Sequence, residues 1–418
     1  MHTDERQDPQ PHPSLARSIE EIRAEFPGLA PGTVALDGAA GTLVPTAVID
    51  AVARAMRDAM ANLHGEFAAS ARSTGTRAAA RAAIADLVGG TPDGVILGPN
   101  MTTMTFHLAD ALAAGWTAGD EVIVTSLDHD ANIRPWVLAA QRAGATVRWA
   151  QFDVQTGELP AEVFDVLISD RTQLVAVTAA SNAIGTKPEV AAITGRAHAA
   201  GALTYVDGVH ATPHGPVDVA ALGADFYACS TYKFFGPHTG AVIASPALLE
   251  RITPAKLVPA ADSVPERFER GTPPFELMAG VTAAVDWIAG LTATRGERRD
   301  RILAAMQATE RHLADLLARA LDGLSGIPGV RVLGSAARRT STISFVINGH
   351  APNAVARQLA AQGIAVWDGD NYAHELMRRF GLGDSGGAVR ASLVLYNDVA
   401  DVDRFLEAVA RVAGSAAQ

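Results

Sequence analysis

The sequence has very little cysteine: Cys229 is the single one among 418 residues. One thiol cannot form an internal disulfide or a cysteine-rich zinc site, so a reducing compartment, the cytoplasm, is the expected location. Long apolar runs are also missing, since no stretch of about 18 residues lacks a polar interruption, and this argues against a membrane span. The histidines do not have the spacing of metal ligands, so no metal site is predicted.

Basic residues are few relative to acidic ones, 34 against 45, which gives a formal net charge of −11. A nucleic-acid partner is therefore not expected, because phosphate binding needs a basic face. The polar residues 1–14 contain no apolar stretch that could serve as a secretion signal, and they are predicted to form a mobile tail. With 48% hydrophobic residues, the rest of the chain is expected to fold around a buried core.

Short β-branched runs alternate with alanine-rich segments of helical length, the pattern of parallel strands joined by crossover helices. The predicted fold class is therefore α/β with a mainly parallel sheet. The expected strands are Val95–Leu97, Glu121–Thr125, Thr146–Ala150, Leu174–Thr178, Leu203–Val206, Phe226–Ala228 and Ala241–Ala244. Covering helices are expected at Ala78–Leu87, Met104–Ala114, Asn132–Ala143 and Glu189–Ala200.

The pattern changes after Pro274, beyond a Gly/Pro-rich stretch that suits a domain junction. Long helical segments at Glu276–Leu291 and Glu297–Leu324 precede isolated strands at Val330–Leu333, Thr342–Ile347 and Val389–Leu395. We therefore predict a large domain over residues 15–274, including an N-terminal arm, and a smaller α+β domain over residues 275–418.

Residues capable of chemistry cluster after two of the predicted strands. Asp207 and His210 follow one strand, and a Ser-Thr-Tyr-Lys run ending in Lys233 follows the next. Both groups would project from the carboxyl ends of parallel strands, where open α/β sheets bind ligands. Two phenylalanines directly follow Lys233, and an apolar setting lowers the pKa of an amine. An amine of low pKa is what Schiff-base chemistry requires.

These segments resemble the class V aminotransferase group of pyridoxal-phosphate (PLP) enzymes, specifically its cysteine desulfurase-like branch, from about Ala35 to Asn397. The resemblance implies PLP fold type I and a PLP cofactor. In the S-x-x-K segment of that family the lysine binds PLP covalently, and Lys233 occupies that place. The D-x-x-[QH] segment matches Asp207, which would face the pyridine nitrogen, and His210, which would bond the phenolate oxygen of the ring. An aspartate beside the ring keeps its nitrogen protonated.

Other matched positions imply the rest of the cofactor site. Thr102 and Thr103 open a predicted helix and would bind the phosphate, although the usual glycine of the family is Met101 here. Ser230 and Tyr232 would complete the phosphate site. His129 matches the imidazole that stacks on the pyridine ring, and Asn182 matches the side chain that contacts the ring oxygen or the substrate carboxylate.

Two further matches concern the substrate and the partner subunit. Arg390 corresponds to the arginine that binds the α-carboxylate of an amino acid; the alternative is an ordinary ion pair with Asp398 or Asp368. Thr272 resembles the residue that reaches the cofactor phosphate of the partner subunit, which implies a homodimer with shared active sites.

The resemblance fails at the nucleophile. Where desulfurases carry a catalytic cysteine this chain has Tyr372, and where they carry the preceding arginine it has Trp367. A phenol cannot hold a persulfide, so the desulfurase mechanism does not transfer with the fold. Cys229 is expected to be a buried apolar side chain.

We therefore predict a C–S β-lyase acting on a cysteine-derived substrate. Lys233 would accept the Cα proton, Tyr372 would donate a proton, and Tyr372 and Trp367 would line the pocket. An amino-acid epimerase or aminotransferase is the alternative within the family, and a non-catalytic PLP-binding scaffold is the alternative from another class. A dinucleotide-dependent dehydrogenase is disfavoured because no G-x-G-x-x-G follows the first strand.

Overall fold

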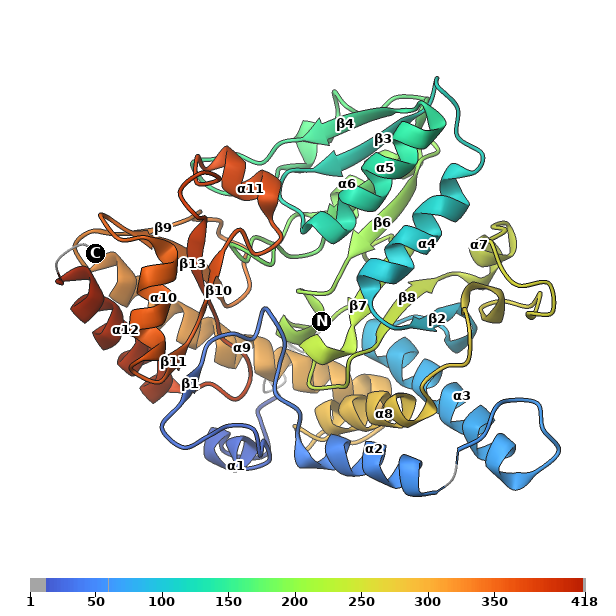
Figure 1. The fold of residues 1–418 in the computed structure, drawn as a ribbon, viewed down its shortest axis with the longest axis horizontal. Helices are drawn as coiled ribbons and strands as arrows, with labels where there is room; N and C mark the ends of the chain where they lie inside the picture. The colour runs from blue at the N-terminus through green and yellow to red at the C-terminus, as the bar shows by residue number, and fades with distance from the viewer. Residues whose placement is uncertain (1–12, 59, 416–418) are drawn as a thin grey trace, which may run out of the picture.

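A seven-stranded sheet organises the larger part of the chain, as the computed structural model shows for residues 13–58 and 60–415 (Figure 1). The predicted tail, residues 1–14, lies almost wholly outside these described residues. In spatial order the strands are β2 (Val95–Gly98), β8 (Gly240–Ala244), β7 (Phe226–Ser230), β6 (Leu203–Asp207), β5 (Thr172–Thr178), β3 (Glu121–Thr125) and β4 (Thr146–Ala150). Strand β8 is antiparallel to both neighbours, and the others share one direction. The predicted α/β class with a mainly parallel sheet is confirmed.

Two apolar layers sandwich this sheet because successive strand residues point to opposite faces. Tyr227 and Cys229 of β7 belong to one buried cluster with α3, α6 and α8, whereas Phe226 and Ala228 belong to another with α4, α5 and α7. The helices of the chain up to α8 are α1 (Ile19–Arg23), α2 (Thr46–Arg57), α3 (Ala68–Val88), α4 (Met101–Ala113), α5 (Arg134–Ala143), α6 (Val190–Ala199), α7 (Pro246–Glu250) and α8 (Phe275–Ala289).

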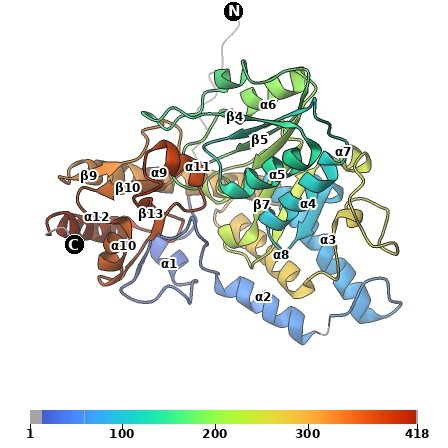
Figure 2. The same cartoon turned by 45° about the horizontal axis from the view of Figure 1, so that its top comes forward.

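The C-terminal part forms a second, antiparallel sheet beside the first (Figure 2). Its strands, in spatial order, are β12 (Trp367–Gly369), β13 (Ala388–Ser392), β10 (Thr342–Ile347) and β9 (Val330–Val332). Its helices are α9 (Arg298–Ser325), α10 (Pro352–Ala360), α11 (His374–Arg379) and α12 (Val399–Ala413). The predicted α+β character is therefore present, and α10, α11 and α12 add helices that the sequence pattern did not reveal.

Contacts cross the predicted domain boundary in both directions. Strand β1 (Val34–Ala35) pairs in parallel with β11 (Ile364–Ala365), and Val34 and Leu36 are buried in the core of the C-terminal part. Helix α8 lies on the other side of the boundary in sequence, yet Phe275 and Met278 belong to the same buried cluster as α3. The boundary between residues 274 and 275 stays a prediction.

Helix α4 begins at Met101, three positions before the predicted start at Met104. Asn100 is its N-cap, and the Asn100 Oδ1 accepts a hydrogen bond of 2.9 Å from the backbone N–H of Thr103. An Asn at an N-cap satisfies one of the free N–H groups of the first turn. This cap explains why the helix begins at Met101 and not at the predicted Met104. Thr102 and Thr103 therefore lie inside the first turn of α4.

Gly240, the first residue of β8, allows this helix start to approach the sheet. A Cβ on Gly240 would lie 2.6 Å from the carbonyl carbon of Asn100 and 2.7 Å from the nitrogen of Met101. Both are backbone atoms, so no side-chain rotation could relieve the overlap.

We expect Gly240→Ala to lower the free energy of unfolding by about 1–3 kcal/mol, because overpacking displaces the start of α4. Denaturant titration of the cofactor-free protein measures the change. Gly195→Ala is the matched control: Gly195 lies in α6 with no neighbouring atom within 4 Å of the added Cβ, and alanine stabilises a helix interior by about 0.5–1 kcal/mol over glycine. Equal effects of the two substitutions would contradict this account of Gly240.

Candidate active site

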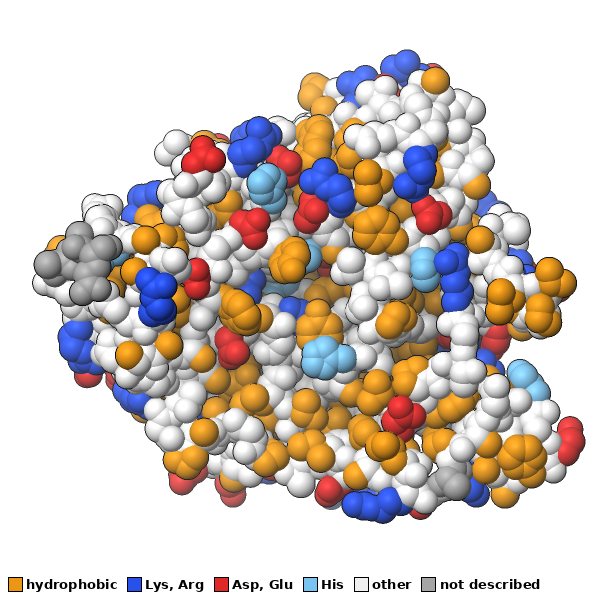
Figure 3. All heavy atoms as spheres, viewed as in Figure 1, with side chains coloured by type: hydrophobic (Ala, Val, Ile, Leu, Met, Phe, Trp, Pro, Cys, Tyr) orange, Lys and Arg blue, Asp and Glu red, His pale blue; other side chains and the backbone are white. Residues whose placement is uncertain are grey.

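A cavity of about 440 Å³ lies at the carboxyl ends of the strands, between the two sheets. Figure 3 shows the molecule hollowed on this face, with apolar side chains around the opening. Most of the predicted site residues line it: Thr102, His129, Asn182, Asp207, His210, Ser230, Tyr232, Lys233, Trp367, Tyr372 and Arg390. Thr103 and Thr272 do not line this cavity.

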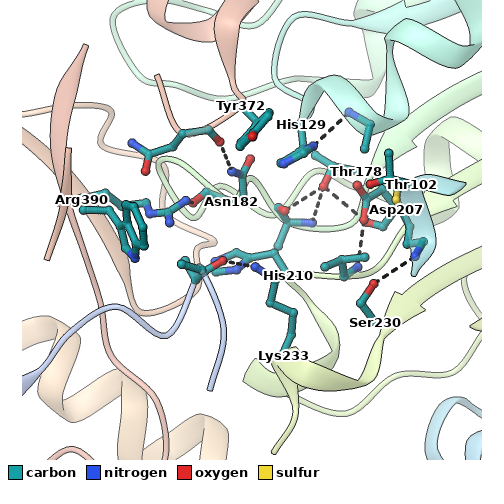
Figure 4. Close-up of a pocket in the computed structure, with 18 of the residues that line it drawn as sticks. Thr102, His129, Thr178, Asn182, Asp207, His210, Ser230, Lys233, Tyr372 and Arg390 are labelled. Atoms are coloured by element: carbon teal, nitrogen blue, oxygen red, sulfur yellow. Dashed lines mark hydrogen bonds between the residues drawn. The ribbon is translucent and has the colours of Figure 1, made fainter. Parts of the chain in front are cut away.

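Lys233 ends the short turn that follows β7 and directs its amine into the cavity (Figure 4). The Nζ donates a hydrogen bond to the carbonyl oxygen of Ala39 and lies 5.0 Å from the centre of the Tyr232 ring. Burial and, to a smaller extent, the charge of Arg390 lower the pKa of this amine to about 7, against the opposing effect of the Asp207 charge. At neutral pH a substantial fraction of the amine is thus uncharged and nucleophilic.

Asp207, the last residue of β6, provides the buried carboxylate of the site. Its Oδ1 accepts a hydrogen bond of 2.9 Å from the N–H of Val209. This bond fixes the orientation of the carboxylate, although Asp207 does not cap a helix. Burial raises the pKa of Asp207 to about 6, against the opposing effects of this hydrogen bond and the Lys233 charge. A cationic ring nitrogen placed here would favour the ionised carboxylate further.

A second buried carboxyl, Asp128, supports the loop that carries His129. It accepts hydrogen bonds from the Thr125 hydroxyl and from Nδ2 of Asn132, the latter at 2.6 Å. Burial raises the pKa of Asp128 to about 8, and the nearby charge of Asp207 acts in the same direction. The sequence pattern did not single out this residue, although it directly precedes His129.

His129 presents a neutral imidazole to the cavity. Burial, together with the charges of Lys233 and Arg390, lowers its pKa to about 3. Its Nδ1 accepts the N–H of Ala131 at 3.0 Å, which assigns the ring proton to Nε2. The Tyr372 ring lies nearly parallel to the imidazole, with 5.3 Å between ring centres and 18° between planes (Figure 4).

The segment that carries Tyr372 is held in an unusual backbone conformation. Asn371 and Tyr372 have φ angles of 54° and 55°, in the left-handed region that non-glycine residues rarely adopt. Such a conformation persists where surrounding contacts over-determine it. Here the Tyr372 carbonyl accepts the N–H of Asp130 at 2.7 Å, and the Asn371 carbonyl accepts Nδ2 of Asn182 at 2.8 Å. The segment is therefore fastened to two loops of the larger sheet.

Arg390 extends from β13 toward Asn182 in the cavity (Figure 4). The side chain is 5% exposed, and its Nη1 donates to the carbonyl oxygen of Asn182 at 3.1 Å. Across the described ranges it forms no ion pair; Asp398 instead caps α12. Burial lowers the pKa of Arg390 to about 10, which leaves it charged at neutral pH. The alternatives of an ordinary ion pair with Asp398 or Asp368 are therefore not realised.

His210 faces the second sheet as well as the cavity. Its Nε2 lies 3.1 Å from the Thr340 hydroxyl and 2.8 Å from the Thr342 hydroxyl, so this nitrogen already has partners within the protein. Burial holds the pKa of His210 well below its usual value. The predicted bond to the ring oxygen of PLP would thus have to come from Nδ1.

The opposite end of the cavity is formed by the start of α4. The Oγ of Ser230 accepts the N–H of Met101 at 3.2 Å, and Thr102 borders the cavity one residue further into the helix. A helix start with free N–H groups is a suitable site for a phosphate. Tyr232 closes this end, its ring stacked on His238 at 4.8 Å between centres.

Thr272 borders a second cavity, of about 380 Å³, together with Arg270 and His238. Because His238 stacks on Tyr232, this second cavity adjoins the phosphate end of the first. The structure describes one chain, so the predicted role of Thr272 in a partner subunit stays a prediction.

Sequence analysis missed several cavity residues. Ala39 lies between Gly38 and Gly41, in a segment to which sequence analysis assigned no role, and Thr178 ends a predicted strand without a recognisable motif. Asn371 contributes a backbone carbonyl, which no side-chain pattern reveals.

The donor set fits PLP. A buried amine of lowered pKa, a buried carboxylate, a neutral imidazole and a helix start surround one cavity. The buried Oδ1 of Asn182 has no hydrogen-bond partner, which leaves an acceptor for an incoming ligand. The fold and the site together define a PLP-dependent enzyme of fold type I.

The comparisons with known proteins agree. The model of the class-V aminotransferase family matches residues 34–405, and the chain belongs to that family. It is 34% identical to an uncharacterized protein of Mycobacterium tuberculosis, over 95% of this chain and 99% of that protein. It is also 34% identical to a probable cysteine desulfurase of Vibrio cholerae, over 94% and 98% of the two chains. A cysteine desulfurase structure from Escherichia coli aligns with a TM-score of 0.83 and 29% identity, covering 94% of this chain and 98% of that one.

The protein is thus a cysteine desulfurase-like, PLP-dependent enzyme of class V. Among the residues that the structure describes, no helix is both long and apolar enough to span a bilayer.

The electrostatics of Lys233 predict a pH dependence for cofactor attachment. The amine attacks only when uncharged, so the attachment rate at saturating PLP should rise with pH and level off above about 7. Arg390→Gln removes a charge that lowers the Lys233 pKa, so its midpoint should move to higher pH; Asp207→Asn removes a charge that raises it, so its midpoint should move lower. Stopped-flow absorbance after mixing cofactor-free protein with PLP measures the attachment rate, and its pH midpoint is compared between the two variants. Midpoint shifts of the same sign would contradict the opposing effects of Arg390 and Asp207 on the Lys233 pKa.

Proposed function

We propose that this enzyme is a C–S β-lyase acting on a cysteine derivative without forming a persulfide on the protein. The observation that carries the proposal is the placement of its only thiol. Cys229 is 0% exposed, lies in β7 within the core, and does not line the cavity. Burial raises the pKa of this thiol to about 12, which removes its nucleophilic form. At the position expected for a desulfurase nucleophile, Tyr372 offers a phenol.

The cavity orients an amino acid by its two polar ends. The Arg390 guanidinium binds the α-carboxylate, and the unpartnered Oδ1 of Asn182 accepts a hydrogen bond from the ligand. Lys233, Asp207, His129 and the α4 start would hold PLP, which when bound supplies an electron sink that acidifies Cα. With the carboxylate at Arg390 and the amino group toward Lys233, the side chain of the substrate extends toward Trp367 and Tyr372.

Lys233 performs the proton transfer. Lys233 would hold the cofactor, and its uncharged Nζ, with a pKa near 7, would accept the Cα proton of a bound substrate at neutral pH. The Cβ–S bond then breaks, sulfur takes the bonding electrons, and a proton from Tyr372 or water completes the thiol. Hydrolysis releases the remaining carbon and nitrogen as pyruvate and ammonia, so atoms and electrons balance.

We also propose a homodimer in which Thr272 serves the partner's site. Its support is the second cavity beside Tyr232 and His238, which adjoins the phosphate end of the first. The single free, buried cysteine suits the reducing cytoplasm, which we propose as the location.

Incubation with S-substituted cysteines should release pyruvate and ammonia in equal amounts. Lys233→Ala should reduce the rate by at least about a hundredfold, because it removes the base. Coupled assay of pyruvate measures the rate, and mass spectrometry in deuterium oxide follows Cα exchange. Exchange with full recovery of the substrate would instead identify an epimerase, formation of a keto acid with the sulfur retained would identify an aminotransferase, and no exchange across a broad panel would indicate a scaffold.

No sulfur should remain on the protein during turnover. Mass spectrometry of the enzyme quenched with an alkylating agent should show Cys229 as an unmodified thiol, and a thiol reagent should label it quickly only after denaturation. A persulfide at Cys229 in native enzyme would refute the persulfide-free mechanism.

A further inference from the structure

Alternate residues in and directly before β10 carry hydroxyl groups, although this strand lies in the interior of the protein. Thr340, Thr342 and Ser344 are each at most 4% exposed. Their spacing of two residues places them on one face of the strand. Ser344 donates to the carbonyl oxygen of Ala183, in a loop of the larger sheet, at 2.7 Å. Buried hydroxyls need hydrogen-bond partners, so the partners of the two threonines show what this face serves.

Both threonines contact His210, which borders the cavity together with Lys233 (Figure 4). The Nε2 of His210 lies 2.8 Å from the Thr342 hydroxyl and 3.1 Å from the Thr340 hydroxyl. The Nδ1 of the same ring forms no hydrogen bond within residues 13–58 and 60–415. The second sheet thus engages one nitrogen of this imidazole and leaves the other for a ligand in the cavity.

The imidazole of His210 is neutral and therefore carries a single ring proton. Burial is the main cause that holds its pKa well below the usual value, and the nearby His214, Arg390 and Lys233 act in the same direction. The ring centre of His214 lies 4.5 Å away. A neutral imidazole has one N–H donor and one acceptor nitrogen. The position of the proton decides whether the cavity meets a donor or a lone pair.

The hydroxyl of Ser392 decides this position. Ser392 stands opposite Thr342 in the pairing of β10 with β13, and the two hydroxyl oxygens are 2.7 Å apart. Ser392 is 0% exposed, and its Oγ has no other hydrogen bond in the described part of the chain. Its proton must therefore go to Thr342, whose own proton then goes to Nε2 of His210.

The reverse arrangement leaves one buried proton without an acceptor. If Nε2 donated to Thr342, the Thr342 hydroxyl would have to donate to Ser392, and the Ser392 proton would have no partner. Leaving a buried donor unpaired is costly. Thr340 does not decide between the two arrangements, because its hydroxyl also lies 3.5 Å from the carbonyl oxygen of Gly185.

We propose that Thr342, oriented by Ser392, is a positioning residue that keeps the proton of His210 on Nδ1, where it donates a hydrogen bond to the phenolate oxygen of PLP. The hydrogen bond received at Nε2 polarises the ring and makes Nδ1–H a better donor. With the proton on Nε2, a lone pair would face the negatively charged oxygen and repel it. The inference rests on PLP occupying the cavity and not on which reaction follows.

The first experiment locates the proton by nitrogen NMR of the full-length, cofactor-free protein labelled with ¹⁵N-histidine. Protonated and unprotonated ring nitrogens resonate far apart, and loss of signals in His210→Gln identifies the ring. The proton should reside on Nδ1 in the unaltered protein. Thr342→Val removes the donor to Nε2 and should shift the population toward Nε2–H, with Thr340 as the remaining partner. Thr342→Ser keeps a hydroxyl and should restore the Nδ1–H form.

The second experiment titrates the visible absorption of bound PLP with pH. Thr342→Val should raise the midpoint by about 0.5–1 pH unit, because a less stabilised phenolate lets the cofactor keep its proton to higher pH, and a weakened hydrogen bond to a charged group has roughly this effect. Thr342→Ser should leave the midpoint near that of the unaltered enzyme. Thr309→Val is the matched control, since Thr309 is 1% exposed and its hydroxyl has no partner in the described ranges.

Several results would overturn the inference. A proton on Nε2 in the unaltered protein does so without any variant, and this measurement decides even if Thr342→Val does not fold. An unchanged His210 proton in Thr342→Val, a changed proton with an unchanged midpoint, or an equal effect of Thr309→Val also does so. Neither experiment uses a substrate, so the presence or absence of pyruvate release tests the proposed lyase separately.

Discussion

The burial of one amine is the constraint on which the rest of this site depends. Lys233 follows a strand in the middle of the sheet, and Phe234 and Phe235 behind it are packed into the core. Its Nζ is consequently held among apolar walls and two opposing charges, Arg390 and Asp207. An amine on the surface would be protonated at neutral pH and unable to serve as nucleophile or base. The sheet, by bringing consecutive strand ends to one edge, provides the enclosure.

The second sheet contributes what the first cannot. Arg390 and Trp367 come from neighbouring strands of the smaller sheet, and the Asn371–Tyr372 segment is fastened to loops that leave the larger one. A strained pair of backbone conformations is tolerated there because hydrogen bonds on both sides hold it. In the proposed reaction this fixed segment, with a phenol where a desulfurase has its thiol, forms part of the substrate pocket.

The side chains of the cavity form an inner charged group, Lys233, Asp207 and Arg390, and an outer aromatic one, Trp367 and Tyr372. The inner charged residues would bind the ionic groups of the cofactor and of any α-amino acid. They therefore favour amino-acid chemistry at this site but do not distinguish one substrate side chain from another. Trp367 and Tyr372 lie further out, at 50% and 72% exposure, where the variable part of a substrate would be placed in the proposed reaction. Selection by the outer group takes place in contact with solvent and is therefore modest, whereas disruption of the inner group leaves a buried charge unpaired and is costly.

The sequence by itself determined the fold class, the strands of the central sheet and most residues of the cavity, since these depend on local patterns: short apolar runs, helical periodicity, and polar groups directly after a strand. It did not predict that α4 begins three residues earlier, at Met101, behind the Asn100 cap, nor did it predict α10, α11 and α12. Only the tertiary structure decided that β1 joins the C-terminal core, that Asn182 holds the loop of Tyr372, and that His210 is engaged by Thr340 and Thr342. Those features join residues far apart in the chain, and their contacts depend on how two separate sheets pack, which no local pattern encodes.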